Sequence, residues 1–163
     1  MITFFVEGQT DGLFIKALFP DIEKDVVEYS RKPNDKINKY IQTIDKMYGK
    51  YFFLFDTDTK EPEEKLEKLL NQIKSLKKEN CFPVIVQIES WYRAGCSENL
   101  CKKYKIKYIS DTEKYDKRKM RQDFNTDQLI NIFQEILNEF SFDSAQQLNA
   151  SFKNFYLNVS NIL

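Results

Sequence analysis

Acidic residues lie at the ends of three short apolar runs of this sequence, directly after the run or two residues further on. They are Glu7, Asp56, Asp58 and Glu89. Asp11 lies about one helical turn beyond Glu7. In a parallel α/β sheet, ligands bind at the carboxyl ends of the strands, and carboxylates that converge there repel one another unless a cation neutralises them. Because oxygen donors favour Mg²⁺ or Mn²⁺ over zinc, the spacing predicts a site for one of these two ions.

Each acid also has a simpler interpretation, because Asp is a common helix N-cap and Glu in a first helical turn complements the helix dipole. Histidine is absent from the 163 residues. This absence excludes Ser-His and Cys-His triads and every histidine-ligated metal site. Catalysis by this chain would therefore rest on carboxylates, lysines, hydroxyls or thiols.

The elements that position these acids alternate between strand-like runs and segments of helical periodicity, which is typical of a parallel sheet covered on both faces. The expected strands are 2–6, 25–29, 51–55, 83–88 and 106–109, and the expected helices are 10–18, 34–48, 62–78, 126–140 and 148–159. The pattern predicts an α/β fold with a mostly parallel central sheet of four to five strands, helices on both faces and two C-terminal helices. One domain is expected over 1–163, with a core over about 1–109 and a basic loop and helices over about 110–163.

Charge gives a weaker indication of partners. The 25 basic and 25 acidic residues cancel, so no general attraction to nucleic acid or anionic lipid is expected. Residues 93–123 nevertheless hold ten Lys or Arg and five acids. Such a segment is able to bind phosphates or to form a solvated helix and loop, and both interpretations stay open.

The sequence also bears on whether the chain is directed to a membrane or out of the cell. The first residues lack the pattern of a signal peptide, and no apolar stretch is long enough for a transmembrane helix, so a cytoplasmic location is expected.

Cys81, Cys96 and Cys101 are an odd number without paired CxxC motifs, which disfavours a disulfide framework or a four-ligand zinc site. The aromatic pair Trp91 and Tyr92 is interpreted as core in preference to a base-stacking surface.

Two motifs resemble a known family. Residues 6–11 (VEGQTD) resemble the glutamate motif of Toprim domains, and residues 53–58 (FLFDTD) resemble their Asp-x-Asp motif. Residues 87–94 (QIESWYRA) further resemble a segment of the Toprim modules of OLD-family nucleases and of small stand-alone Toprim proteins. The Asp-x-Asp motif lacks the following glycine that is frequent in primases and topoisomerases, so the OLD-like branch is preferred.

The resemblance implies a Toprim-like three-layer sandwich and a Mg²⁺- or Mn²⁺-dependent nuclease that hydrolyses phosphodiester bonds, in a bacterial or phage-defence setting. It implies that Glu7 and Asp11 bind one metal with Asp56, while Asp58 and Glu89 bind or orient a second; Glu7 is alternatively the general base. Cations opposite the metals would contact phosphate, and the candidates by position are Lys60, Arg93, Lys117 and Lys119.

The expected partners are nucleic acid, either RNA such as tRNA or DNA, and a second copy of the chain. In an alternative, the chain is a Toprim subunit that is inactive alone and docks on a separate ATPase, because it lacks a phosphate-binding P-loop of its own. A third and weaker alternative is a receiver or flavodoxin-like domain, which also has acids after parallel strands.

Overall fold

Four strands form the sheet on which the first half of the chain is built. The structure, a computed structural model, describes residues 1–162. The chain divides into two units, Met1–Pro83 and the residues from Val84 onward. The division therefore comes at the end of the last strand. The predicted single domain over 1–163 stays a prediction.

The sheet is parallel, with the strand order β2-β1-β3-β4. Ile2 pairs with Lys24 on one neighbouring strand and with Lys50 on the other. The strands are β1 (Ile2–Val6), β2 (Lys24–Glu28), β3 (Lys50–Asp56) and β4 (Cys81–Val84). These findings confirm the predicted α/β fold with a parallel central sheet, and the four strands fit a Toprim-like sandwich.

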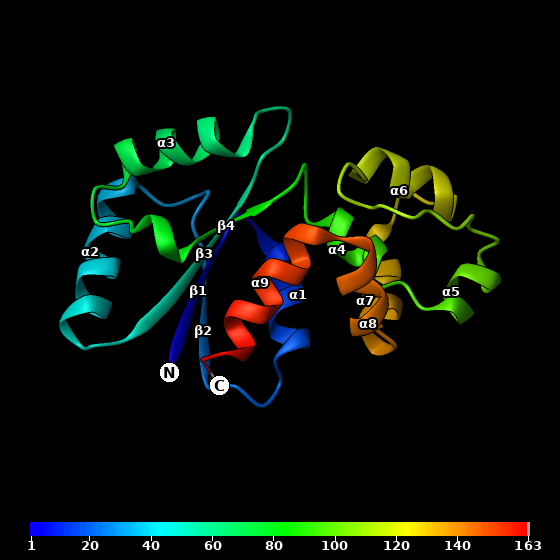
Figure 1. The fold of residues 1–163 in the computed structure, drawn as a ribbon, viewed down its shortest axis with the longest axis horizontal. Coiled ribbons are helices and arrows are strands. Elements are labelled where there is room, and N and C mark those ends of the chain that lie inside the picture. Colours follow the sequence, from blue (N-terminus) through cyan, green and yellow to red (C-terminus); the bar gives the residue numbers. More distant parts are fainter. Residues whose placement is uncertain (163) are drawn as a thin grey trace. The chain divides into compact units, whose positions relative to one another are not determined.

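Helices cover both faces of this sheet (Figure 1), namely α1 (Gln9–Leu18) on one face and α2 (Asn34–Lys46) and α3 (Pro62–Gln72) on the other. Alternate residues of β1 and β3 point to opposite faces, so the aromatic rings separate into two groups. Phe4 stacks on Phe52 at 5.4 Å on the α1 side. Phe5 and Phe53 pack into the cluster under α2 and α3.

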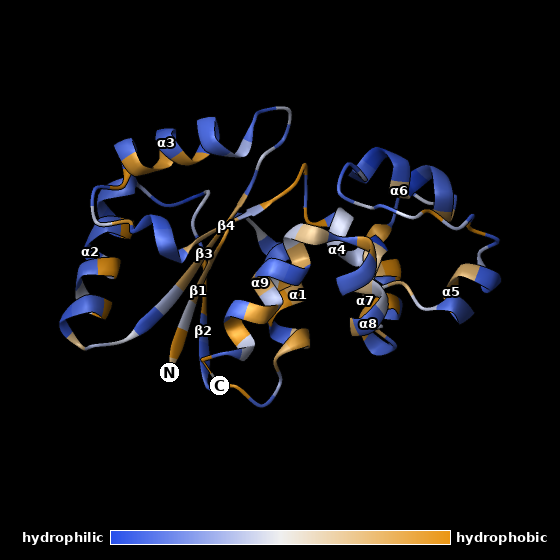
Figure 2. Ribbon diagram, in the orientation of Figure 1, coloured by the Kyte–Doolittle hydropathy of each residue, from blue (hydrophilic) through white to orange (hydrophobic). Residues whose placement is uncertain are grey.

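Burial of these rings is the main stabilising contribution to the first unit, at about 1.5–3 kcal/mol for each fully buried side chain. The apolar residues of α2 recur at spacings of three and four, and Ile37, Ile41 and Ile44 are buried as the periodicity predicts. Figure 2 shows apolar β1 and β3 between helices that are polar on their outer sides.

Helix α3 ends at Gln72, six residues before the predicted end at 78. The apolar period continues through Ile73 and Leu76, and both side chains are buried. However, the Ser75 backbone N–H donates to Asn38 Oδ1 at 2.9 Å instead of continuing the helix. A tertiary hydrogen bond therefore ends the helix at a point that periodicity alone does not reveal.

The predicted strand 83–88 begins two residues earlier and ends at Val84, after a short 3₁₀ helix, η1 (Lys78–Asn80). Val86 has a φ of 59°, a left-handed conformation that is unfavourable for a β-branched residue. This backbone conformation stops the strand and turns the chain into α4 (Glu89–Ala94).

The second unit is helical over the part of the chain that the structure describes. Besides α4 it contains α5 (Glu98–Lys103), α6 (Lys117–Phe124), α7 (Leu129–Asn138), α8 (Phe142–Leu148) and α9 (Ala150–Ser160). Helices α7 and α9 correspond to the two predicted closing helices, and the short α8 between them is an addition. No helix within residues 1–162 is long and apolar enough to cross a membrane.

The predicted fifth strand, 106–109, is not a strand. Its two apolar positions do not bury one face, because Tyr108 beside them is 79% exposed, and Lys105 before it has a φ of 55°. The Lys107 carbonyl accepts a hydrogen bond from the Arg93 side chain at 2.8 Å and not from a neighbouring strand.

Trp91 forms the centre of the second unit. It is fully buried, lies 5.1 Å from the Phe155 ring and donates from Nε1 to Ser151 Oγ at 2.8 Å. Tyr92 is also fully buried and lies 4.3 Å from Phe133. Both aromatic residues are core, as the sequence interpretation favours.

Candidate active site

The sheet order places β1 at a topological switch point. From β1 the chain passes through α1 to β2 on one side, and then through α2 to β3 on the other side. In open parallel sheets, ligands bind at the carboxyl ends of the strands where the order reverses in this way. Glu7 directly follows β1 and Asp56 is the last residue of β3, so both residues lie at this point.

Glu7 and Asp56 are in contact, because Glu7 Oε2 accepts a hydrogen bond from the Asp56 backbone N–H at 3.4 Å. Glu7 is half-buried. Burial raises the pKa of the Glu7 carboxyl, the charge of Lys65 and the Asp56 N–H lower it, and the charge of Asp58 raises it. The net direction is upward, which is the direction that suits a carboxylate to accept a proton near neutral pH.

Asp11 lies on the first turn of α1 and is 6% exposed. Its Oδ2 accepts from the Gly8 backbone N–H at 3.3 Å, so the side chain returns toward the turn that follows Glu7. The N-cap of α1 is Gly8. Asp11 therefore helps to fix the β1–α1 turn and also brings a second carboxylate to the end of β1.

Asp58 occupies the turn after β3 with a φ of 53°, a left-handed conformation that Asp tolerates better than most residues. It forms an ion pair with Lys65 of α3 at 2.8 Å. Burial alone would lower the pKa of Lys65, but the hydrogen bond and charge of Asp58, together with the charges of Glu7 and Asp56, raise it. One lysine thus lies among three of the predicted carboxylates.

Tyr29, which directly follows β2, joins the same group. Burial raises its pKa well above the ordinary value, and the charges of Glu7, Asp56 and Asp11 raise it further. Its backbone N–H donates to the Val6 carbonyl at 2.9 Å. The hydroxyl therefore stays protonated near neutral pH and is a hydrogen-bond donor beside the carboxylates.

The sequence interpretation missed both Lys65 and Tyr29. Tyr29 directly follows β2, so the rule that identifies Glu7 and Asp56 also identifies this residue once neutral polar side chains are included. Lys65 has no such signal, because its role depends on how α3 packs. The predicted cation Lys60 instead forms an ion pair with Glu64, and both side chains are largely exposed.

Glu89, the fifth predicted carboxylate, belongs to the second unit. It is the first residue of α4 and is 4% exposed. Burial raises the pKa of its carboxyl, while its own backbone N–H and the charges of Lys117 and Arg121 lower it. Its expected participation with the four carboxylates of the first unit stays a prediction.

The other predicted phosphate contacts also lie in the second unit. The charge of Lys117 lowers the pKa of Glu89. The Lys117 backbone N–H donates a hydrogen bond to Gln87 Oε1 at 3.3 Å. Lys119 Nζ lies 5.5 Å from the centre of the Tyr115 ring. Arg93 is only 3% exposed and donates to the Lys107 carbonyl at 2.8 Å, and its expected contact with phosphate stays a prediction.

The donors at the ends of β1 and β3 are all oxygens, which fits Mg²⁺ or Mn²⁺. Within residues 1–162, no three His, Cys, Asp or Glu side chains lie close enough together to hold a metal ion. Mg²⁺ does not require such a cage, because it keeps several waters and is bound by one or two carboxylates together with substrate phosphates. The contact between Glu7 and the Asp56 backbone brings the two residues together at the strand ends, and the predicted metal site there stays a prediction.

Searches against protein-family models, curated proteins and solved structures found no match to the chain.

Proposed function

We propose that this protein is a Mg²⁺- or Mn²⁺-dependent nuclease of the Toprim type that hydrolyses phosphodiester bonds in RNA or DNA. The main support is the contact between Glu7 and Asp56 at the switch point of a parallel sheet, where two acidic motifs separated by 49 residues come together. Asp11, Asp58 and Lys65 add charges to the same place.

In this proposal Glu7 and Asp56 bind one cation together with water and a substrate phosphate. Asp11 and Asp58 add negative charge at the same strand ends. When bound, Mg²⁺ or Mn²⁺ would neutralise the carboxylates and polarise the phosphodiester group. As an alternative to binding the cation, Glu7 would be the general base that accepts the proton of the attacking water, a role that its burial and raised pKa favour.

Lys65 is the cation that we assign to the first unit in place of Lys60. Its ammonium group pairs with Asp58 and faces Glu7 and Asp56. In this position it compensates the carboxylates, and it would be able to donate to a phosphate oxygen as negative charge develops in the transition state. Tyr29 supplies a neutral donor at the same edge of the sheet.

The substrate is expected to be a structured RNA, such as tRNA, or a DNA presented by a partner. A formal net charge of zero gives little attraction to long duplex DNA. The basic surface is concentrated on α6, where Lys117, Arg118, Lys119 and Arg121 occupy one short helix. We place this reaction in the cytoplasm.

The test compares the wild-type protein with Asp56→Asn on tRNA, single-stranded RNA, single-stranded DNA and plasmid, each in Mg²⁺, Mn²⁺ or EDTA. Asp45→Asn is the matched control, because Asp45 is a half-buried acid on α2, away from the carboxyl ends of the strands, that pairs with Lys77. We expect cleavage by the wild type and by Asp45→Asn, and loss of cleavage in EDTA and in Asp56→Asn. Bound Mn²⁺, measured by electron paramagnetic resonance, should fall only in Asp56→Asn.

Equal cleavage by Asp56→Asn and the wild type would reject the assignment. If the wild type binds Mn²⁺ at this site but cleaves none of the four substrates, the proposal of a self-sufficient nuclease is wrong, and the alternative of a subunit that requires an ATPase partner replaces it.

A further inference from the structure

Two cysteine thiols meet beside a buried arginine in the second unit. Cys96 follows α4 and is 5% exposed, whereas Cys101 on α5 is half-buried. Their sulfur atoms lie 3.6 Å apart. Arg93 Nη1 lies 3.7 Å from the Cys101 sulfur. The third cysteine, Cys81, is in the other unit.

The segment between the two cysteines is anchored where it begins. Ser97 caps α5 by accepting the Leu100 N–H at 3.1 Å, and its hydroxyl donates to Glu139 at 2.5 Å. Before it, the Gly95 carbonyl accepts the Ser141 N–H at 2.9 Å. The proximity of the two sulfurs therefore results from a fixed turn and is not a chance approach of two mobile side chains.

Arg93 carries a positive charge that lacks a carboxylate partner. The side chain is 3% exposed, and among the described residues no acid forms an ion pair with it. Nη2 donates to the Lys107 carbonyl, the guanidinium lies 5.9 Å from the Tyr115 ring, and Nε has no hydrogen-bond partner. A buried charge requires compensation, and a thiolate at Cys101 would supply the missing negative charge.

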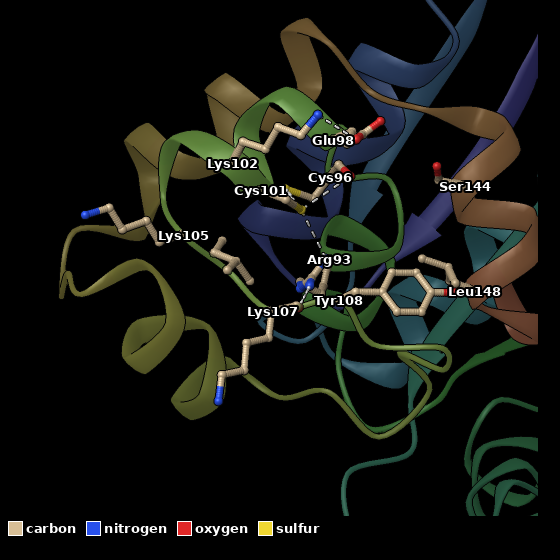
Figure 3. Close-up of a pocket in the computed structure, with 11 residues that line it drawn as sticks. Arg93, Cys96, Glu98, Cys101, Lys102, Lys105, Lys107, Tyr108, Ser144 and Leu148 are labelled. Carbon is tan, nitrogen blue, oxygen red and sulfur yellow. Dashed lines mark hydrogen bonds and ion pairs between the residues drawn. The ribbon is translucent and has the colours of Figure 1, made fainter.

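The thiols open onto a cavity of about 640 Å³ (Figure 3). Three lysines line it together with Arg93, namely Lys102, Lys105 and Lys107. Glu98 is the only acid among its lining residues, and it pairs with Lys102 at 2.6 Å. The cavity is therefore suited to a small molecule that carries negative charge.

We propose that Cys96 and Cys101 form a redox-active dithiol that reacts with anionic low-molecular-weight disulfides. The Cys101 thiolate attacks one sulfur of the disulfide, a mixed disulfide forms, and one thiolate of the reagent leaves. The Cys96 thiol then loses its proton to water and attacks the Cys101 sulfur, which releases the second thiolate. The protein is oxidised by two electrons to one disulfide, and the reagent is reduced to two thiols.

The geometry allows this reaction with little movement. A disulfide needs sulfurs about 2.05 Å apart, so the two sulfurs, now 3.6 Å apart, have to approach by about 1.5 Å. With the Cys101 sulfur as the thiolate, the Cys96 S–H is its donor. This hydrogen bond and the charge of Arg93 lower the pKa of Cys101 to about 6, against the opposing effects of burial and Glu98. The same pairing raises the pKa of Cys96.

The proposal does not depend on nuclease activity, and its first test measures thiols directly. The full chain is incubated with oxidised glutathione at pH 7 and then analysed by intact-protein mass spectrometry and peptide mapping. We expect the wild type and Cys81→Ser to lose two hydrogens through a Cys96–Cys101 disulfide. Cys96→Ser should instead accumulate the mixed disulfide with glutathione at Cys101, because the second thiol is missing.

A second test asks whether the lysines that line the cavity favour an anionic reagent. The oxidation rate with oxidised glutathione, which is anionic, is compared with the rate with cystamine, which is cationic, in the wild type and in a variant with Lys102, Lys105 and Lys107 all changed to Gln. These lysines are exposed, so the variant should fold. We expect the variant to react about tenfold more slowly with the anionic reagent, and not more slowly with cystamine.

A pH profile of Cys101 alkylation by iodoacetamide provides a third readout, with a midpoint expected near 6. The charged groups that determine it are Arg93 on α4, Glu98 and Lys102 on α5, and Glu139 beside Cys96. Retention of all three thiols in excess oxidised glutathione, a disulfide through Cys81, or equal loss of rate with both reagents would overturn the proposal.

Discussion

Replacement of Lys65 by Met tests whether the carboxylates at the ends of β1 and β3 repel one another. Lys65 pairs with Asp58 at 2.8 Å and also lowers the pKa of Glu7. Met keeps much of the length and apolar character of the side chain and removes only the charge. The carboxylates would then lose the compensating charge of Lys65, so the folded state should become less stable.

The size of this loss follows from the distance and the exposure of the pair. Two unit charges 2.8 Å apart attract by about 1.5 kcal/mol in water. The side chains of Lys65 and Asp58 are 22% and 47% exposed, so solvent screening and the entropy of ordering reduce the net value to about 1 kcal/mol. For a protein of this size, such a change lowers the melting temperature by about 2–4 °C.

The assay is thermal unfolding by circular dichroism in EDTA at pH 7 and at pH 4. Lys65 has a raised pKa, so its stabilising contribution is present at pH 7 and would be lost only as the pH rises through that pKa. On the acid side the contribution fades as the carboxylates gain protons. Glu7, whose pKa is raised, is protonated before a carboxyl of ordinary pKa. The difference between Lys65→Met and the wild type should therefore shrink at pH 4.

Lys60→Met is the matched control, because Lys60 pairs with Glu64 at an exposed i,i+4 position of little energetic value. Mg²⁺ should raise the melting temperature of Lys65→Met more than that of the wild type, since a bound ion would replace the missing charge. A melting temperature of Lys65→Met equal to or above that of the wild type in EDTA would refute the reasoning.

Three further predictions concern stability. Gly95→Ala places a Cβ 2.0 Å from the Phe140 ring, so it should cost about 1–3 kcal/mol by overpacking, measured by urea unfolding; in a Phe140→Ala background the same change should cost almost nothing. Gly12→Ala meets only ordinary contacts at 3.6 Å and beyond, so it should raise the melting temperature by stabilising α1 by about 0.5–1 kcal/mol. Glu7→Gln should stabilise the metal-free protein at pH 7, because burial penalises the ionised carboxyl. That gain should vanish below the ordinary pKa of 4.5, where both states bind the proton, and scanning calorimetry at the two pH values measures it.

The features that sequence reasoning predicts well are those encoded by neighbouring residues. The run 51–55 is apolar at every position and ends in acids, so both β3 and the site residue Asp56 can be predicted. The strand-end rule for Glu7 needs only the assumption of parallel strands, which the alternation of strands and helices supports.

The features that it misses depend on tertiary contacts. The end of α3 is set by the hydrogen bond between Ser75 and Asn38, which lie far apart in the sequence. Lys65 acquires its importance only when α3 packs beside β3. The run 106–109 has strand-like residues, but the Lys107 carbonyl accepts its hydrogen bond from the buried Arg93 side chain and not from another strand. The strand propensity of these residues does not reveal that arginine.

The left-handed backbone at Val86 has a consequence for directed evolution. A β-branched side chain at this φ costs about 1–2 kcal/mol relative to glycine. Glycine would offset part of this stabilisation, because it raises the conformational entropy of the unfolded chain. Valine and glycine codons differ by one nucleotide. A library made by random mutagenesis and selected for heat resistance should therefore recover Val86→Gly early, and the recovered variants would reveal whether an unstrained turn before α4 still supports the chemistry of this protein.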